Sequence, residues 1–352
     1  MATGRILIYG ATGYTGKLVA RESARRGLDV VLAGRDPRKL EAVASEHGFE
    51  ARAFALDDSP RLHAALEDVA AVLHIAGPFS KTSRPMADAC LATRTHYLDI
   101  TGEIDVFEAL ARRDGEAKEA GVTLLPGVGF DVVPSDCLAV YVAKRLHEPT
   151  TLRIGLAGLG GGMSRGTART LAESLGDGLR IRRQGVLVSR PLGSLEHKFE
   201  LGAGPMRGVA MPLADLASAF HSTGIPNIET YVVMSGRIPG LLRVAGLVTP
   251  ILRLPSVQRF LSSRIDAMPE GPDDATRMST RSVILAEVEG PGGERAAAML
   301  ETPSGYALTQ VAAVEAARRA AEGSAPPGFQ TPATAFGADF VLECSDSRRT
   351  DL

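Results

Sequence analysis

The chain has 352 residues, of which 45% are hydrophobic and 23% charged, a balance typical of a globular protein with room for two hydrophobic cores. Its formal net charge of -2 argues against a general attraction to nucleic acid or to an anionic membrane, so we expect no nucleic-acid partner and only local anion sites. The three scattered cysteines, Cys90, Cys137 and Cys344, favour a reducing cytoplasmic location over a disulfide framework. No His/Cys cluster has metal-ligand spacing and no apolar run reaches about 18 residues, so we predict neither a metal site nor a transmembrane segment.

The first 125 residues alternate short β-branched runs with helical patterns. Strands are predicted at Arg5–Tyr9, Asp29–Ala33, Glu50–Ala55, Ala71–Ala76, His96–Ile100 and Val122–Pro126. Helices are predicted at Gly13–Arg26, Pro37–His47, Ser59–Leu66, Pro85–Thr93 and Ile104–Ala120. This alternation predicts an α/β fold, with a Rossmann-type, doubly wound parallel sheet that helices cover on both faces.

The pattern changes after Pro126. Longer, more amphipathic strands are expected at 151–158, 185–190, 197–202 and 228–234, followed by a hairpin over Thr280–Pro303 and a helix over Tyr306–Gly323. These elements predict a second, α+β domain with a mixed or antiparallel sheet. We therefore divide the chain into a Rossmann domain at 1–134, a substrate domain at 135–304, and a segment at 305–352 that packs back onto the first domain.

The motif "GATGYTG" stands between the first strand and the first helix. Its first glycine allows a sharp turn, the second allows a pyrophosphate to approach the backbone, and the third allows close packing of helix on sheet. Backbone N–H groups and the positive end of the helix then hold the phosphates. The cofactor-binding residues expected here are Gly10, Thr12, Gly13, Tyr14, Thr15 and Gly16.

The second strand ends in "LAGRD", which bears on the choice of dinucleotide. NAD-selective folds place an acidic residue here to bind the ribose 2′-hydroxyl, whereas Arg35 occupies that position in this chain. A guanidinium binds a 2′-phosphate through charge-assisted hydrogen bonds, and Lys39 lies one turn into the next helix to assist. Asp36 is the counter-argument, because its carboxylate can serve a 2′-hydroxyl. We predict NADP(H).

Two further stretches are candidates for the cofactor site. Asp57 follows the third strand and is placed to meet the adenine, although an ordinary loop aspartate is an equal alternative. Gly77 and Pro78 follow the fourth strand, where a close backbone approach suits the nicotinamide ribose; a plain turn is the alternative.

The stretches "HYLDITGE" and "GFDVVPSD" place polar residues at the carboxyl ends of the fifth and sixth strands, where ligands collect in this architecture. The candidate catalytic residues are Tyr97, Ser135 and Asp131. Tyr97 has a core position as its alternative, with its hydroxyl hydrogen-bonded to the backbone. Asp99, Glu103 and Asp131 have the alternative role of fixing loops through backbone N–H groups. His74 and His96, on strands, are expected to be core residues.

Several motifs together carry a family resemblance: "YGATGYTGKLVA", "LAGRDPRKL", "AGPFS", "HYLDITGE", "GFDVVPSD" and "TPATAFGADFV". The chain resembles the saccharopine dehydrogenase-like NADP-binding oxidoreductases, and within them the bacterial trans-acting enoyl reductases, over residues 1–146 and 305–341. The resemblance implies an NADP-linked Rossmann domain, a second α+β domain and reduction of an activated double bond. The middle of the chain, which shapes the substrate pocket, departs from the family pattern.

We therefore expect an NADPH-dependent reductase of a C=C bond conjugated to a carbonyl, on an apolar or polyketide-like small molecule. The alternatives are reduction of a C=N bond and a non-catalytic, NADP-binding or lipid-associated protein. The apolar segment Pro239–Leu261 is expected to line the pocket, with peripheral membrane contact as its alternative. The hairpin at Thr280–Pro303 is able to supply an edge strand for a homodimer.

Overall fold

The computed structural model describes residues 4–158, 164–166, 168, 178–201, 204–233, 257, 263–265 and 267–352. The chain forms two compact units, and each is built from two stretches of sequence. The first unit comprises Met1–Val133 and Gly305–Ser345, and the second comprises Pro134–Ser304 and Asp346–Leu352. Most of the apolar segment Pro239–Leu261 lies outside the described residues.

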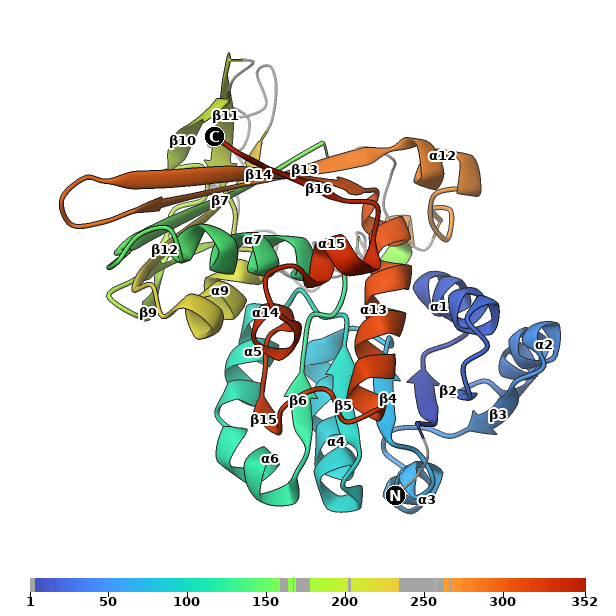
Figure 1. Cartoon of the computed structure of the whole chain (residues 1–352). Coiled ribbons are helices and arrows are strands. Elements are labelled where there is room, and N and C mark those ends of the chain that lie inside the picture. The colour runs from blue at the N-terminus through green and yellow to red at the C-terminus, as the bar shows by residue number, and fades with distance from the viewer. Residues whose placement is uncertain are drawn as a thin grey trace. The chain divides into compact units, whose positions relative to one another are not determined.

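The sheet of the first unit is parallel and, in the described part of the chain, seven-stranded (Figure 1). Its strands, in spatial order, are β15 (Gly328–Phe329), β6 (Thr123–Leu125), β5 (His96–Asp99), β4 (Ala71–His74), β1 (Ile6–Tyr9), β2 (Val30–Gly34) and β3 (Glu50–Ala53). Strands β1, β2 and β4 are buried along their whole length, as expected for strands with helices on both faces. The chain reverses its winding direction between β1 and β4, which makes this a doubly wound sheet and confirms the predicted fold class.

The helices of the first unit largely follow the predicted pattern. They are α1 (Tyr14–Arg25), α2 (Pro37–His47), α3 (Ser59–Leu66), α4 (Phe79–Thr93), α5 (Ile104–Ala111), α6 (Asp114–Ala120), α13 (Gly305–Ala321), α14 (Pro332–Phe336) and α15 (Phe340–Cys344). Two boundaries differ from expectation. Helix α4 begins six residues before Pro85, which lies inside it, and the single helix predicted over Ile104–Ala120 is interrupted between α5 and α6.

Residues 305–345 return to the first unit after the main part of the second unit, residues 134–304. Helix α13 packs along α1 and over β4 and β5, as Figure 1 shows, and β15 extends the sheet beside β6. The last residues behave differently, because β16 (Arg348–Asp351) pairs with β14 (Arg295–Pro303) of the second unit. The expectation that all of 305–352 packs onto the Rossmann domain was therefore wrong for residues 346–352.

The second unit is built on a mixed sheet, as predicted. Its main strands, in spatial order, are β10 (Glu196–Leu201), β11 (Gly204–Ala210), β12 (Asn227–Val233), β7 (Thr151–Ala157), β13 (Arg281–Glu289), β14 and β16, with β8 (Leu179–Arg183) and β9 (Val186–Arg190) attached at β12. Strands β7 and β12 are parallel and the other pairs are antiparallel. The described helices of this unit are α7 (Val133–Ala143), α9 (Asp215–Thr223) and α12 (Asp274–Ser279).

The predicted hairpin is present as β13 and β14, but its predicted place at the edge of the sheet was wrong. Strand β13 pairs with β7 as well as β14, and β14 pairs with β16 on its other side. The hairpin is therefore not at the edge of the sheet, because β16 lies beside the middle of β14, over Ala298–Glu301.

Candidate functional site

The glycine-rich turn follows β1 and leads into α1. Gly10 has a φ of +95°, and a Cβ there would lie 2.9 Å from the backbone nitrogen of Ala76, so that the turn needs glycine for both conformation and space. At Gly16 a Cβ would lie 2.3 Å from the carbonyl oxygen of Gly10, which only glycine avoids. Gly13 is exposed, and the nearest atom to a Cβ there is 3.5 Å away, so its surface is open to a ligand. The turn at Gly10 and the close packing at Gly16 agree with the roles predicted for these glycines, and the approach of a pyrophosphate at Gly13 stays a prediction.

The start of α1 differs from the starts of the next three helices. Carboxylates cap α2, α3 and α4 by accepting bonds from their first N–H groups, and these carboxylates are Asp36, Asp58 and Glu103. By contrast, α1 has Gly13 at its N-cap, no side-chain cap and no acidic residue in its first turn. Among the N-termini of α1 to α4, that of α1 is therefore the one without a carboxylate from the described residues. A positive helix end without a carboxylate is the environment that an anionic phosphate needs. Thr12 and Thr15 lie half-buried beside it.

Arg35 and Asp36, at the end of β2, have separate environments. The carboxylate of Asp36 accepts hydrogen bonds from the backbone nitrogens of Arg38 at 3.1 Å and Lys39 at 3.2 Å, and so caps its own helix. The guanidinium of Arg35 is exposed, and no carboxylate in the described parts of the chain pairs with it. The ammonium of Lys39 lies 3.9 Å from Asp36 and is largely exposed. The arrangement leaves the Arg35 guanidinium exposed after β2, while Oδ1 of the half-exposed Asp36 carboxylate caps α2.

Tyr9 links this edge of the sheet to Asp57. Its hydroxyl donates a hydrogen bond to the carbonyl of Phe54 at 3.2 Å. Burial raises the pKa of the Tyr9 phenol, while the nearby Arg35 guanidinium opposes that shift and the exposed Asp57 carboxylate adds to it. Arg35 and Asp57 therefore lie close enough to Tyr9 for both charges to act on its hydroxyl, on the side of the sheet predicted to hold the adenosine end of the cofactor.

Glu103 holds the loop after β4, which contains Gly77 and Pro78. Its two carboxylate oxygens accept hydrogen bonds from the backbone nitrogens of Phe79 at 2.8 Å and Ser80 at 2.7 Å. This cap explains why α4 begins at Phe79, since a side chain from another loop satisfies its first N–H groups. The predicted loop-fixing role of Glu103 agrees with these bonds.

Asp99 joins the loops after β5 and β6. Its carboxylate accepts hydrogen bonds from the Tyr97 hydroxyl at 2.6 Å, from the Thr101 nitrogen at 2.9 Å and from the Gly127 nitrogen at 3.0 Å. Burial raises the pKa of the Asp99 carboxyl to about 6, although these hydrogen bonds favour the ionised form. Together with Glu103, Asp99 makes one rigid assembly of the loops that follow β4, β5 and β6.

The three predicted catalytic residues have different environments. Tyr97 has no exposed surface, and burial raises the pKa of its phenol well above its ordinary value. Ser135 is 2% exposed and lies on α7, in the second unit. Asp131 is exposed, and its carboxylate lies against Gly102, where a Cβ would be 3.0 Å from Oδ2. Of the three, Asp131 is the residue with a surface that a substrate can reach, and the catalytic roles stay predictions.

Of the two strand histidines, His74 lies in the core and His96 is half-buried at the start of β5. His74 has no exposed surface, burial lowers its pKa to about 3, and neither ring nitrogen has a hydrogen-bond partner among the described residues. His96 accepts a hydrogen bond through Nδ1 from the Thr123 nitrogen at 3.0 Å. Both rings are thus placed as structural, neutral side chains at physiological pH.

Residues that the sequence reasoning missed come from α13. Tyr306 contacts the ring of Tyr14, and Thr309 accepts a hydrogen bond from the nitrogen of Phe130. The helix itself was predicted, but no local pattern indicates which strand or turn it meets. Asp36 did have a signal, because an aspartate directly before Pro37 is typical of a helix N-cap.

Two classes of feature are absent from the described residues. No group of three or more His, Cys, Asp or Glu side chains there is arranged to hold a metal ion. No helix in the described ranges has the length and apolar character needed to cross a membrane.

Comparison with known proteins agrees with this geometry. Residues 6–125 match the family model of the saccharopine dehydrogenase NADP binding domain. A putative trans-acting enoyl reductase of Mycobacterium tuberculosis is 34% identical over 189 residues, covering 48% of this chain and 44% of that protein. A trans-acting enoyl reductase of Mycobacterium ulcerans is 31% identical over 160 residues, covering 42% of this chain and 37% of that protein. The matched region thus covers less than half of the length of each of these relatives.

Solved structures show the same fold. Saccharopine dehydrogenase (L-Glu forming) from Saccharomyces cerevisiae aligns with a TM-score of 0.65 at 13% identity, over 99% of each chain. The homospermidine synthase of Legionella pneumophila, solved in complex with NAD, aligns with a TM-score of 0.63 at 10% identity, over 99% of this chain and 91% of that one.

The family model over residues 6–125 confirms the prediction of NADP(H) as the cofactor. Residues 6–125 are therefore similar to the saccharopine dehydrogenase NADP binding domain, as the sequence motifs indicated.

Proposed function

We propose that this protein is an NADPH-dependent reductase of a carbon–carbon double bond conjugated to a carbonyl. The observation that carries the proposal is the match to trans-acting enoyl reductases at 31–34% identity. Two features of the described residues support it: the start of α1 has no side-chain cap there, and Arg35 has no carboxylate partner there, so that a pyrophosphate and a 2′-phosphate have separate places.

The reaction asks little covalent chemistry of the protein. Bound NADPH supplies a hydride to the β-carbon of the substrate. The protein has to orient cofactor and substrate, stabilise the developing enolate oxygen and deliver a proton. The rigid assembly built by Asp99 and Glu103 would serve orientation, since it fixes the loops at the end of β4, β5 and β6. Asp131 is our candidate for proton handling, and Tyr97 a candidate for support of the Asp99 carboxylate.

Reduction of a C=N bond is the second candidate function. It is suggested by the saccharopine dehydrogenase type of the cofactor domain, and an acidic pocket would favour it by stabilising an iminium. In this chain Asp99 is fully buried, and half-buried Glu103 accepts backbone hydrogen bonds with both carboxylate oxygens, so that Asp131 is the exposed one of the three predicted acids. For this reason we place the C=C reaction first.

The chemical class of the substrate, the location and the partners of the protein are part of the same proposal. We propose an apolar or polyketide-like substrate, with a cytoplasmic location. A homodimer and peripheral membrane contact are further predictions, and the oligomeric state is measured on the purified protein by light scattering.

The reaction type is tested by following NADPH absorbance with a panel of enones, enoyl thioesters and cyclic imines. We expect oxidation of NADPH with members of the first two classes. Turnover with imines alone would replace the proposal by its second candidate. Saturable NADPH binding without turnover of any class would favour the non-catalytic alternative.

The cofactor preference is tested at Arg35. Arg35→Glu is expected to weaken NADPH binding roughly ten- to hundredfold while changing NADH binding little, because one or more charge-assisted bonds to the 2′-phosphate are lost. The dissociation constants are measured by calorimetry for both nucleotides. Arg38→Glu makes the same charge change at an exposed position nearby and is the matched control. An unchanged ratio of the two affinities in Arg35→Glu would refute the assignment.

A further inference from the structure

Helix α13 begins beside the loops of the cofactor site, although it is more than 280 residues later in the chain than α1. Its first turn is fixed to the segment after β6: the Thr309 hydroxyl accepts a hydrogen bond from the Phe130 nitrogen at 2.9 Å. Close backbone approaches reinforce this contact. A Cβ at Gly129 would lie 3.1 Å from Thr309, and one at Gly305 would lie 3.2 Å from the ring of Phe130. Tyr306 directly follows Gly305, so its position is set by these contacts within the first unit.

Tyr306 contacts the first residue of α1. The rings of Tyr14 and Tyr306 have centroids 5.1 Å apart and planes at 87°, which is the edge-to-face arrangement that aromatic pairs favour. Tyr14 directly follows Gly13, the exposed glycine at the N-cap of α1. The ring contact thus acts at the helical turn whose N–H groups face the predicted pyrophosphate.

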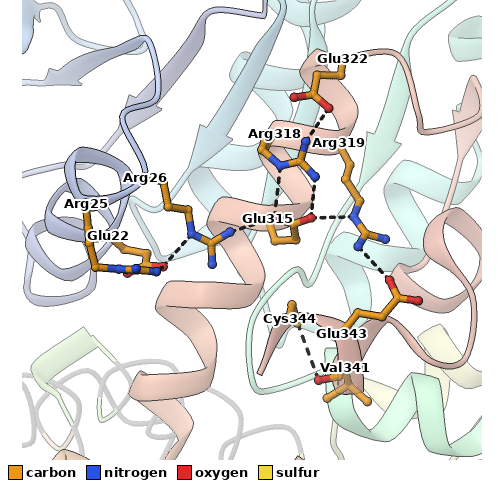
Figure 2. Close-up of polar contacts among 10 residues, drawn as sticks. All are labelled: Glu22, Arg25, Arg26, Glu315, Arg318, Arg319, Glu322, Val341, Glu343 and Cys344. Atoms are coloured by element: carbon orange, nitrogen blue, oxygen red, sulfur yellow. Dashed lines mark hydrogen bonds and ion pairs between the residues drawn. The ribbon is translucent and has the colours of Figure 1, made fainter. Parts of the chain in front are cut away.

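The opposite end of α1 is held by the same partner helix. The guanidinium of Arg26 donates to the carboxylate of Glu315, in the middle of α13, at 2.8 Å, as Figure 2 shows. Since α13 meets α1 near its first residue and just beyond its last, it fixes the axis of α1 at two points. The contact at Tyr306 is the one of these two that lies beside the phosphate-binding turn.

We propose that Tyr306 is a positioning residue for the pyrophosphate of the pyridine dinucleotide, acting through the ring of Tyr14. The inference rests on the NADP-binding assignment but not on the type of bond reduced. The Tyr306 ring holds the first turn of α1 in the direction that presents its N–H groups to the two bridging phosphates. The 2′-phosphate, expected at Arg35 after β2, does not depend on this contact.

The test compares two ligands in the full-length protein. NADPH contains the pyrophosphate, whereas adenosine 2′-monophosphate offers only the 2′-phosphate and the adenosine. Tyr306→Leu removes the aromatic ring and is expected to weaken NADPH binding about threefold to tenfold, the scale of one aromatic pair, with binding of adenosine 2′-monophosphate within about twofold of wild type. Tyr306→Phe keeps the ring and is expected to restore wild-type affinity for NADPH.

A double-mutant cycle with Tyr14→Leu assigns the effect to the ring pair, since the double variant is expected to lose no more than either single variant. Unchanged NADPH affinity in Tyr306→Leu, or an equal loss for both ligands, would overturn the inference. If Tyr306→Leu shows no cooperative thermal transition, Tyr306→Met, which fills the space with a flexible side chain, takes its place in the same comparison. Failure of the wild-type protein to bind NADPH would instead overturn the cofactor assignment itself.

Discussion

Replacing Gly16 by alanine is expected to weaken NADPH binding by about a hundredfold and to destabilise the first unit by about 3 kcal/mol. The added Cβ would lie 2.3 Å from the carbonyl oxygen of Gly10 and 2.7 Å from Cα of Ala11. Both contacts are with backbone, which cannot rotate away as a side chain does. Helix α1 must therefore move off the turn, and its first N–H groups move with it. Calorimetry with NADPH and urea unfolding measure the two effects.

Gly115→Ala is the matched control for this substitution. Gly115 lies in α6, and no atom other than its neighbours comes within 4 Å of a Cβ there. Since alanine is favoured over glycine in a helix by about 0.5–1 kcal/mol, this variant is expected to be slightly more stable and to bind NADPH normally. Wild-type NADPH affinity in Gly16→Ala would show that the turn does not bind the cofactor as described.

Replacing Glu315 by glutamine is expected to destabilise the first unit by about 3 kcal/mol at neutral pH. The carboxylate of Glu315 is 11% exposed and accepts hydrogen bonds from Arg26, Arg318 and Arg319, as seen in Figure 2. Hydrogen bonds from Arg318 and Arg319 outweigh the cost of burial and lower the pKa of Glu315 from 4.5 to about 2. Glutamine has the same shape without the charge, so three guanidinium groups lose their shared anion.

The same pKa shift predicts how the effect depends on pH. Because the pKa is lower in the folded state, the stabilisation is complete above about pH 4.5 and is lost as the pH falls toward 2. The free energies of unfolding of wild type and Glu315→Gln should therefore converge in acid. Glu322→Gln is the control: Glu322 is half exposed and pairs with Arg318 alone, so its loss is expected to cost less than about 1 kcal/mol. A pH-independent difference for Glu315→Gln would contradict the assigned role of its charge.

The sequence by itself determined the parts of this protein that depend on neighbours along the chain. The need for glycine at positions 10 and 16 can be predicted from the sequence. The atoms that exclude a Cβ there belong to residues a few positions away, or to the residues that follow the adjoining strand. The alternation of buried strands with amphipathic helices likewise identified the doubly wound sheet and the cofactor domain. An arginine at position 35 was informative for the same reason, since it follows a strand whose end has a known relation to the ribose.

The tertiary structure decided which partner each polar side chain has. Asp36 was open to a ribose role until its carboxylate was seen to cap α2. Tyr97 was a catalytic candidate by its place near the carboxyl end of a strand, yet the residue is fully buried and its hydroxyl donates a hydrogen bond to Asp99. Glu103 sets the start of α4 from a different loop, so the sequence around Pro85 predicted a later start. A side chain's partner is set by the surfaces that meet in space, and local patterns carry no record of them.

Contacts between distant parts of the chain were the least visible in the sequence. The helix over Tyr306–Gly323 was expected, but its contact with Tyr14 and its ion pair with Arg26 required the folded unit. The last strand, β16, belongs to the second unit, where it pairs with β14. The edge of β14 provides hydrogen-bond partners for the backbone groups of β16. Periodicity along a chain indicates which face of an element is buried; only the folded structure decides what that face is buried against.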